Sequence, residues 1–327
     1  MRQKGSINIL QILTSSITSY RIIKRSFNCA VVQTIDFQTE YMAIDKERQR
    51  RDIERFINKM PSLSTTVGKV MEICSRTDAS PNELNKVISL DPVLTGQVLK
   101  LINSAYYSLV NKVTSLTRAI TMLGMNTVKN MALSTAIISS VAGAKKSKAL
   151  PTKKFWAHSI GAGVSAKLLG EVKGMPVMER EELFLAGLLH DLGKVPFGDE
   201  YIEVLNIAKI EQLPLNEVEL DVMGIDHQEV GLMIADKWRL NPVIAKCIGS
   251  HHGATHLTGE HGNQIALVAL GNIYTNILDH GYAGNPFPKE KEIQMLLDSV
   301  GLSWGEYCGI ADRVVEEIHK AEIFLQI

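Results

Sequence analysis

Residues 182–194 read ELFLAGLLHDLGK, an apolar helical pattern that ends in a histidine–aspartate pair. Its leucines recur at helical spacing, which predicts that one face of the helix is buried. Gly193 follows the pair at the position where a left-handed C-cap is expected. His190 and Asp191 can together bind one hard or borderline cation, because imidazole and carboxylate are both common metal ligands. The alternative is a core histidine beside a capping aspartate.

Further histidines are expected on two other helices. His158 lies in a helix that we expect Thr152 to cap and that carries small residues suited to close packing. His227 follows Asp226, which has the spacing of a capping box with Glu229 and places the histidine in a first helical turn.

A fourth helix ends at a histidine pair, His251-His252. Asn241-Pro242 has the pattern of an N-cap followed by proline at the first helical position, and it predicts a helix that runs to His251. Helix ends carry free backbone groups and border clefts, so they are favourable positions for a site. We therefore predict one shared site, formed by His158, His190, Asp191, His227 and His251. The alternative is that the imidazoles only hydrogen-bond one another and the aspartate.

The order of these residues (His, His-Asp, His, His-His) resembles the motif of the HD-domain superfamily of metal-dependent phosphohydrolases. Within it, the chain is most similar to the HDOD group, the HD-related output domain of bacterial signalling proteins, because a second block resembles the amino-terminal half of that domain. That block comprises MPSL at 60–63, VISLDPVLT at 87–95, INSAYY at 102–107 and AITMLG at 119–124. The resemblance covers roughly residues 55–285.

The resemblance implies an all-α fold, a multi-helix HD-domain-like bundle with a smaller helical amino-terminal subdomain. We expect residues 42–150 to form the amino-terminal part of the HDOD module, residues 151–285 to form the core with the His/Asp cluster, and residues 286–327 to pack on that core as carboxy-terminal helices. The resemblance also implies a divalent cation (Fe, Mn or Zn) and no other cofactor. The metal ligands that it implies are His158, His190, Asp191, His227, His251, His252 and Asn272.

The sequence departs from hydrolytic relatives in two places. Asn272 stands where an HD hydrolase usually supplies an aspartate, and its amide oxygen brings no charge, so metal affinity and hydrolytic activation should both be weaker. HD-GYP enzymes, which open cyclic di-GMP, carry a glutamate after the His-His pair and then Gly-Tyr-Pro. Here Gly253 follows the pair, and the later Gly281-Tyr282 lacks the proline. We therefore do not expect an HD-GYP phosphodiesterase.

Lys194 is the candidate catalytic residue. A cationic side chain beside the cluster could stabilise the charge that develops on a reacting phosphoester. The alternative is a lysine at a helix C-terminus that interacts with the helix dipole.

Helical patterns dominate the rest of the chain, and no run of alternating β-branched residues predicts a sheet. Ser80-Pro81 and Asp91-Pro92 each mark a helix start, with proline at its favoured first position. The other expected helices cover residues 45–55, 65–74, 115–123, 128–141, 204–210, 265–278, 293–297 and 311–324. We find no Walker loop, no dinucleotide fingerprint and no serine triad.

The composition favours a cytoplasmic protein. The chain of 327 residues has 35 basic and 35 acidic side chains, and no basic run interleaved with aromatic residues indicates a nucleic-acid surface. No segment is long and apolar enough for a transmembrane helix. We expect neither nucleic acid nor a membrane as a partner. The scattered cysteines, which we expect to be reduced thiols, are Cys29, Cys74, Cys247 and Cys308.

The first 41 residues differ from the rest of the chain. Lys and Arg outnumber Asp and Glu there, and the apolar stretch at residues 7–18 is broken by polar side chains. Met42 precedes a charged helical pattern. We expect residues 1–41 to be disordered or absent from the native product, with translation starting at Met42.

Two functions from different classes remain open. The first is a regulatory HDOD module that acts on signalling proteins in trans and carries a degenerate metal site. The second is a metal-dependent phosphohydrolase that acts on a nucleotide or another phosphoester. Asn272 and the missing glutamate after His252 favour the first.

Overall fold

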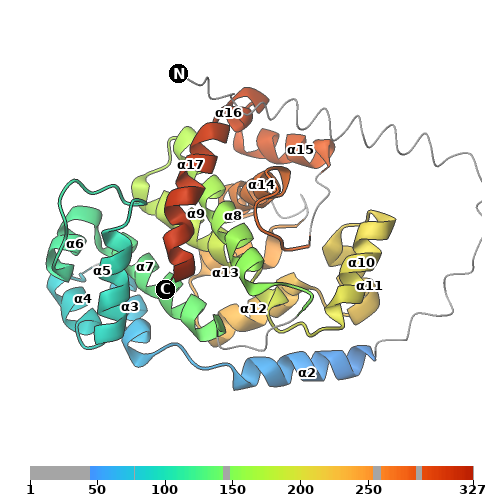
Figure 1. The fold of residues 1–327 in the computed structure, drawn as a ribbon, viewed down its shortest axis with the longest axis horizontal. Helices are drawn as coiled ribbons and strands as arrows, with labels where there is room; N and C mark the ends of the chain where they lie inside the picture. The colour runs from blue at the N-terminus through green and yellow to red at the C-terminus, as the bar shows by residue number, and fades with distance from the viewer. Residues whose placement is uncertain (1–44, 77, 143–147, 253–258, 285–288, 327) are drawn as a thin grey trace, which may run out of the picture.

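The computed structural model describes residues 45–76, 78–142, 148–252, 259–284 and 289–326, and every regular element in these ranges is a helix (Figure 1). The all-α prediction is therefore confirmed. The expectation for residues 1–41 lies outside the described residues. No helix in the described ranges is both long enough and apolar enough to cross a membrane.

Five helices gather at one end of the molecule, at the left of Figure 1. Three of the helix starts predicted here are confirmed, because Ser80, Asp91 and Ser115 each accept a hydrogen bond from the backbone N–H three residues further on. Within this group α7 contacts α3, α5 and α6. The helices are α3 (Thr65–Ser75), α4 (Pro81–Ile88), α5 (Pro92–Ile102), α6 (Leu116–Leu123) and α7 (Met125–Ala142).

The core is built on three helices, α8 (Thr152–Val172), α9 (Val177–Leu189) and α14 (Gly262–Ile277), with α8 in contact with both others. Glycines make this close packing feasible. A Cβ on Gly187 would lie 2.7 Å from the Cα of Gly163, and one on Gly271 would lie 2.6 Å from the carbonyl oxygen of Ala162. The small face predicted for the His158 helix therefore meets its neighbours almost backbone to backbone.

Two further helices complete the site region, α12 (His227–Lys237) and α13 (Pro242–Ser250), and the short 3-10 helix η1 (Leu192–Lys194) packs on α12. Asn241 caps α13 as predicted. Asp226 caps α12, but the expected capping box is incomplete, because the carboxylate of Glu229 pairs with Arg50 at 2.6 Å.

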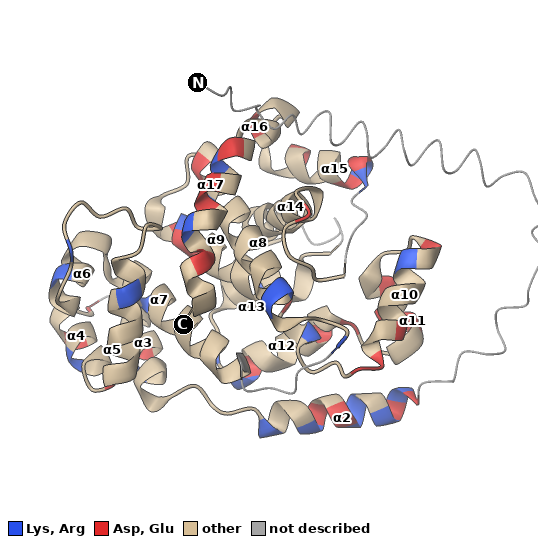
Figure 2. Ribbon diagram, in the orientation of Figure 1, with Lys and Arg blue, Asp and Glu red and all other residues tan. Residues whose placement is uncertain are grey.

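The helix α2 (Lys46–Lys59) lies apart from α3–α7 and contacts α11 (Leu215–Met223) and α12 (Figure 1). Lys237 Nζ donates to the carbonyl oxygen of Asn58 at 3.1 Å. Figure 2 shows that basic and acidic residues intersperse along α2. Its neighbour α11 forms a hairpin with α10 (Tyr201–Glu211).

The carboxy-terminal helices pack on the core. They are α15 (Glu290–Val300), α16 (Trp304–Gly309), α17 (Ala311–Ala321) and η3 (Glu322–Gln326), of which α15 contacts α14 while α17 and η3 contact α8. Phe324 lies against the rings of Tyr106 and Phe184. Because Tyr106 follows α5 and Phe184 belongs to α9, this aromatic cluster joins the group α3–α7 to the core.

Two local predictions are wrong. Thr152 does not cap α8, because Pro151 occupies the N-cap position and Thr152 is already the first helical residue. Gly193 is not a left-handed C-cap, because it lies inside η1 without a positive φ. The helices α11 and α16 were not predicted from the sequence.

Candidate metal centre

The helix ends bring the predicted imidazoles around Asp191. His190 is the C-cap of α9, His227 is the first residue of α12, and His251 is the C-cap of α13. Only His158 lies well inside its helix, α8. All four rings and Asp191 are buried. Within the described ranges, two groups could hold a cation and share Asp191: Asp191 with His227, His251 and His252, and Asp191 with His158 and His190.

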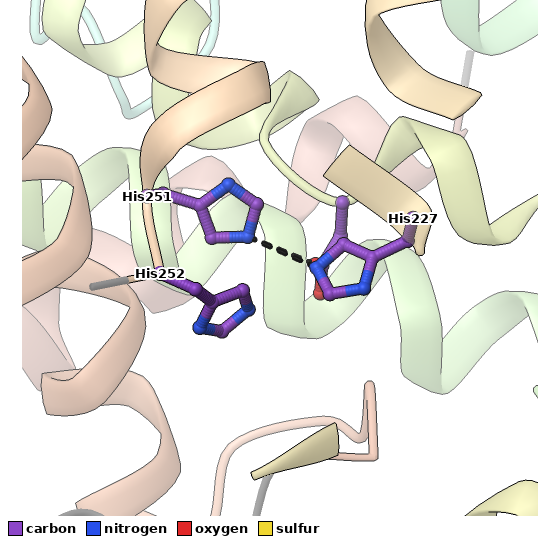
Figure 3. A group of neighbouring side chains, drawn as sticks. His227, His251 and His252 are labelled. Atoms are coloured by element: carbon purple, nitrogen blue, oxygen red, sulfur yellow. Dashed lines mark hydrogen bonds and ion pairs between the residues drawn. The ribbon is translucent and has the colours of Figure 1, made fainter. Parts of the chain in front are cut away.

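On the Oδ1 side of Asp191, two imidazole nitrogens face each other. The Nε2 atoms of His227 and His251 lie 3.4 Å and 3.5 Å from Oδ1 and 3.2 Å from each other (Figure 3). Each Nδ1 faces an acceptor: Glu219 Oε2 at 2.5 Å from His227, and the carbonyl oxygen of Ile248 at 3.0 Å from His251. Since these oxygens only accept, each Nδ1 carries the proton and each Nε2 presents a lone pair.

This arrangement suits a metal. Two imidazole lone pairs and a carboxylate oxygen converge with no proton between them, and Asp191 Oδ1 has no hydrogen-bond partner although it is buried. Buried polar atoms are almost always satisfied, so these convergent acceptors are groups that could hold a cation. Nitrogen and oxygen ligands of this kind are those that Zn, Fe and Mn accept in proteins.

The Oδ2 side of Asp191 is different. Lys194 Nζ donates to Oδ2 at 2.8 Å and to the carbonyl oxygen of Ala283 at 2.8 Å. His190 Nε2 lies 3.3 Å from Oδ2 and has no hydrogen-bond partner, because His190 Nδ1 donates to the carbonyl oxygen of Gly187. An ammonium group therefore already neutralises this half of the carboxylate.

Asn272 engages His158. Its Oδ1 accepts from His158 Nε2 at 3.0 Å and from Asn276 Nδ2 at 3.1 Å. The Nε2 atom of His158 is 3.8 Å from Asp191 Oδ2. In this arrangement His158 Nε2 carries a proton and donates a hydrogen bond to the amide oxygen of Asn272. The side chain at the position of the expected aspartate therefore binds His158.

Burial sets the charge state of the site. It lowers the pKa of His158 to about 3 and that of His251 to about 4, so both rings are neutral near pH 7. Burial alone would raise the pKa of Asp191, but His190 and Lys194 hold it well below its usual range. The site thus presents the neutral rings of His158 and His251 beside one ionised carboxylate.

His252 lies beside the cluster. Its ring packs against those of His251 and His227 (Figure 3), and its backbone N–H donates to Gln228 Oε1 at 2.9 Å. Burial lowers the pKa of this ring well below its usual value.

Glu219 is a residue of the site that was not predicted from the sequence. Its Oε2 accepts from both the backbone N–H and Nδ1 of His227, and its Oε1 accepts from the hydroxyl of Tyr201. A carboxylate in this place fixes the tautomer and orientation of the ring. A signal for it exists, because Glu219 falls at helical spacing among the buried apolar residues Leu215, Val218 and Met223.

Gly193 holds η1 against α12. A Cβ there would lie 1.9 Å from the carbonyl oxygen of His227 and 2.5 Å from the backbone nitrogen of Gly231. This close approach brings Asp191, two residues earlier, within reach of His227. Gly193 is therefore required for the close contact between η1 and α12 and not for a left-handed backbone conformation.

A helical bundle with a histidine–aspartate cluster at its helix ends defines the HD class of folds. Residues 60–254, more than half of the chain, match the HDOD domain family. The chain therefore belongs to the HDOD domain family, and the resemblance noted in its sequence is confirmed.

Solved structures share the fold. An HDOD domain protein of unknown function from Geobacter sulfurreducens is 24% identical, with a TM-score of 0.70 over 86% of this chain and 99% of that one. A protein of Shewanella amazonensis SB2B, whose name proposes a phosphohydrolase, is 19% identical, with a TM-score of 0.64 over 84% of this chain and 98% of that one. A protein of Marinobacter aquaeolei VT8, whose name proposes signal transduction, is 18% identical, with a TM-score of 0.64 over 86% of this chain and 66% of that one.

One curated relative also matches. It is an uncharacterized protein of Treponema pallidum (strain Nichols), 24% identical over 227 residues. The match covers 68% of this chain and 43% of the relative, so the chain spans less than half of that protein's length.

Proposed function

We propose that this chain is a regulatory signalling module that acts on protein partners in trans and is not an efficient phosphohydrolase. The observation that carries this proposal is the amide of Asn272, which accepts from His158 and Asn276 where a hydrolase would present a second carboxylate. Asp191 is the only carboxylate in either candidate metal group of the described residues. A pair of cations at a phosphoester normally needs bridging and flanking carboxylates.

We also propose that the site binds a divalent cation, Fe, Mn or Zn. Asp191, His227 and His251 would hold it, with His252 and His190 at its edge. Such an ion supplies Lewis acidity when bound. The residues of this chain set its surroundings: Glu219 orients His227, the carbonyl oxygen of Ile248 orients His251, and burial excludes bulk water.

Burial further supports a regulatory role. His190, Asp191 and His227 are each 0% exposed, and His251 is 2% exposed. A phosphoester would have to displace packed protein to meet these atoms. A bound cation, by contrast, would join the start of η1 to α12 and α13 and could therefore influence the surface that these helices present to a partner.

The alternative function is hydrolysis of a nucleotide or another phosphoester. It is favoured by the convergent lone pairs of His227 and His251 and by the name of the Shewanella protein. Lys194, the candidate catalytic residue, argues against it, because its ammonium is bound to Asp191 and Ala283 and is buried. The name of the Marinobacter protein agrees with a signalling role.

We propose a cytoplasmic location. Cys74, Cys247 and Cys308 are free thiols in the described part of the chain, as expected in a reducing compartment.

The test combines metal content with turnover. Protein purified without chelator is analysed for Fe, Mn and Zn, and it is then incubated with cyclic di-GMP and with bis(p-nitrophenyl) phosphate under saturating Mn²⁺ or Fe²⁺. We expect bound metal in the wild type, at least tenfold less affinity in His227→Ala or His251→Ala, and no turnover beyond that of these variants. Turnover within the usual range of about 1–1000 per second, abolished in His251→Ala, would overturn the regulatory proposal.

A further inference from the structure

The two oxygens of Asp191 have opposite surroundings. Oδ1 lies between imidazole lone pairs and has no hydrogen-bond partner. Oδ2 accepts from the ammonium of Lys194 at 2.8 Å. A carboxylate that bridges two metal ions uses one oxygen for each, so here one of the two positions already holds a positive charge.

We propose that the ammonium of Lys194 occupies the place of a second cation, so that this site binds a single divalent ion, on the Oδ1 side. This inference rests on the proposed metal site and specifies its stoichiometry. Lys194 is then a positioning residue that holds Asp191 and excludes a second metal.

Lys194 is built to stay in this place. Its side chain is 0% exposed, and the carbonyl oxygen of Ala283 provides a second acceptor for the ammonium. A desolvated ammonium between a carboxylate and a carbonyl has no route to water without breaking both bonds. A divalent ion at Oδ2 would have to displace it or bear strong repulsion at close range.

The other groups on this side also lack what a second ion needs. His158 is 1% exposed, and its Nε2 donates to Asn272. Among the described residues on this side, only His190 Nε2 is left without a hydrogen-bond partner. One nitrogen ligand and an oxygen already shared with an ammonium do not make a cation site, whereas the Oδ1 side offers a full set of acceptors.

The test counts bound ions in the variant Lys194→Met, which keeps most of the side-chain volume and removes the charge. Metal-free protein is titrated with Co²⁺ by calorimetry, and the ions retained after dialysis are counted by elemental analysis. We expect one equivalent in the wild type. In Lys194→Met we expect the first ion to bind roughly tenfold more tightly or better, because a neighbouring positive charge is gone, and a second, weaker equivalent to appear.

Lys167→Met is the matched control. Lys167 is a half-buried lysine of α8, paired with Glu181 at 2.7 Å and away from the cluster, so the same chemical change there should leave one equivalent with unchanged affinity. Asp191→Asn should abolish binding in every background, which shows that the ions counted belong to this site. Two equivalents in the wild type, or unchanged binding in Lys194→Met, would overturn the proposal.

A second set of variants guards against misfolding of Lys194→Met. Asn272→Asp adds a carboxylate but keeps the ammonium, so we expect tighter binding and still one ion. The double variant Asn272→Asp/Lys194→Met should bind two. With Mn²⁺ the bridged pair is recognised by the loss of the isolated-ion EPR signal through magnetic coupling. Two ions in Asn272→Asp alone would overturn the exclusion by Lys194.

These outcomes are separable from those of the proposed function. Phosphoester turnover in the wild type would overturn the regulatory proposal while leaving the count of ions intact. Two ions without turnover would overturn the role of Lys194 and leave the regulatory proposal standing.

Discussion

The helices α3–α6 and the core helices α8 and α9 use polar side chains in opposite ways. In α3–α6, Ser64, Ser80, Asp91 and Ser115 cap helix starts near the surface. In the core, α8 and α9 begin at prolines without any side-chain cap, while histidines and acids are buried where helices end. The first pattern is local and stabilises single helices. The second depends on tertiary contacts, so it is expected to be more costly to disturb.

The largest effect should come from Gly193→Ala. The new Cβ would lie 1.9 Å from the carbonyl oxygen of His227, where no side chain can yield. We expect the free energy of unfolding to fall by about 3 kcal/mol or more, measured by urea denaturation of chelator-treated protein.

The control is Gly68→Ala on α3, where an added Cβ meets nothing within 4 Å. Alanine there should raise the free energy of unfolding by about 0.5–1 kcal/mol. Equal effects of the two substitutions would contradict the contrast between the regions.

Acid should destabilise the core through its buried imidazoles. The pKa of His251 falls to about 4 on folding through burial, so the unfolded chain binds more protons below its ordinary value of 6.5. The stability that the neutral ring contributes is therefore full above pH 6.5 and is lost as the pH falls toward 4. For metal-free protein we expect a loss of about 2 kcal/mol between pH 6.5 and pH 5 from this group.

The matched variant His251→Gln isolates this contribution. Its free energy of unfolding should change less over the same pH interval, by about the 2 kcal/mol assigned to the imidazole. Parallel pH profiles for the wild type and His251→Gln would contradict the shifted pKa.

The same contrast explains how far the sequence could be read. Asn241, Asp91 and Ser80 follow local rules of capping, and the helices that they begin lie where predicted. Thr152 has the right chemistry for a cap but the wrong position, because Pro151 sets the start of α8 one residue earlier. Capping preferences therefore select the N-cap residue only where the backbone conformation allows more than one residue to take that position.

The site was predictable in its residue types but not in its connections. The spacing of His190, Asp191 and His227 on helix ends indicated a cluster. The pairing of Lys194 with Asp191 and Ala283, and of Glu219 with His227, depends on how elements far apart in the chain pack together. No sequence pattern identifies such hydrogen-bond partners. A glutamate among apolar residues at helical spacing, such as Glu219, does indicate a buried carboxylate that needs a partner.

Glu219→Gln should weaken metal binding without unfolding the protein. Three donors meet this carboxylate, the hydroxyl of Tyr201 and two N–H groups of His227, and an amide offers only one oxygen. We expect His227 to lose its fixed tautomer and the affinity for Zn²⁺ or Co²⁺ to fall roughly tenfold, measured by competition with a chelating dye.

Glu181→Gln is the control for that loss. Glu181 is also buried, but it pairs with Lys167 outside the cluster, so metal affinity should not change. A similar fall in both variants would attribute the effect to lost buried charge in general and not to the orientation of His227.

The smallest effect concerns the caps. Asp91 Oδ1 accepts from the backbone N–H of Leu94 at 2.9 Å, so Asp91→Ala should lower the free energy of unfolding by about 1 kcal/mol. Thr152→Ala should change it by less than about 0.5 kcal/mol, because Thr152 is exposed and caps nothing. Neither variant should alter metal affinity, since neither side chain touches the cluster. Thermal melts and metal titrations of both variants check this, and a larger loss in Thr152→Ala than in Asp91→Ala would place a capping role at the start of α8 after all.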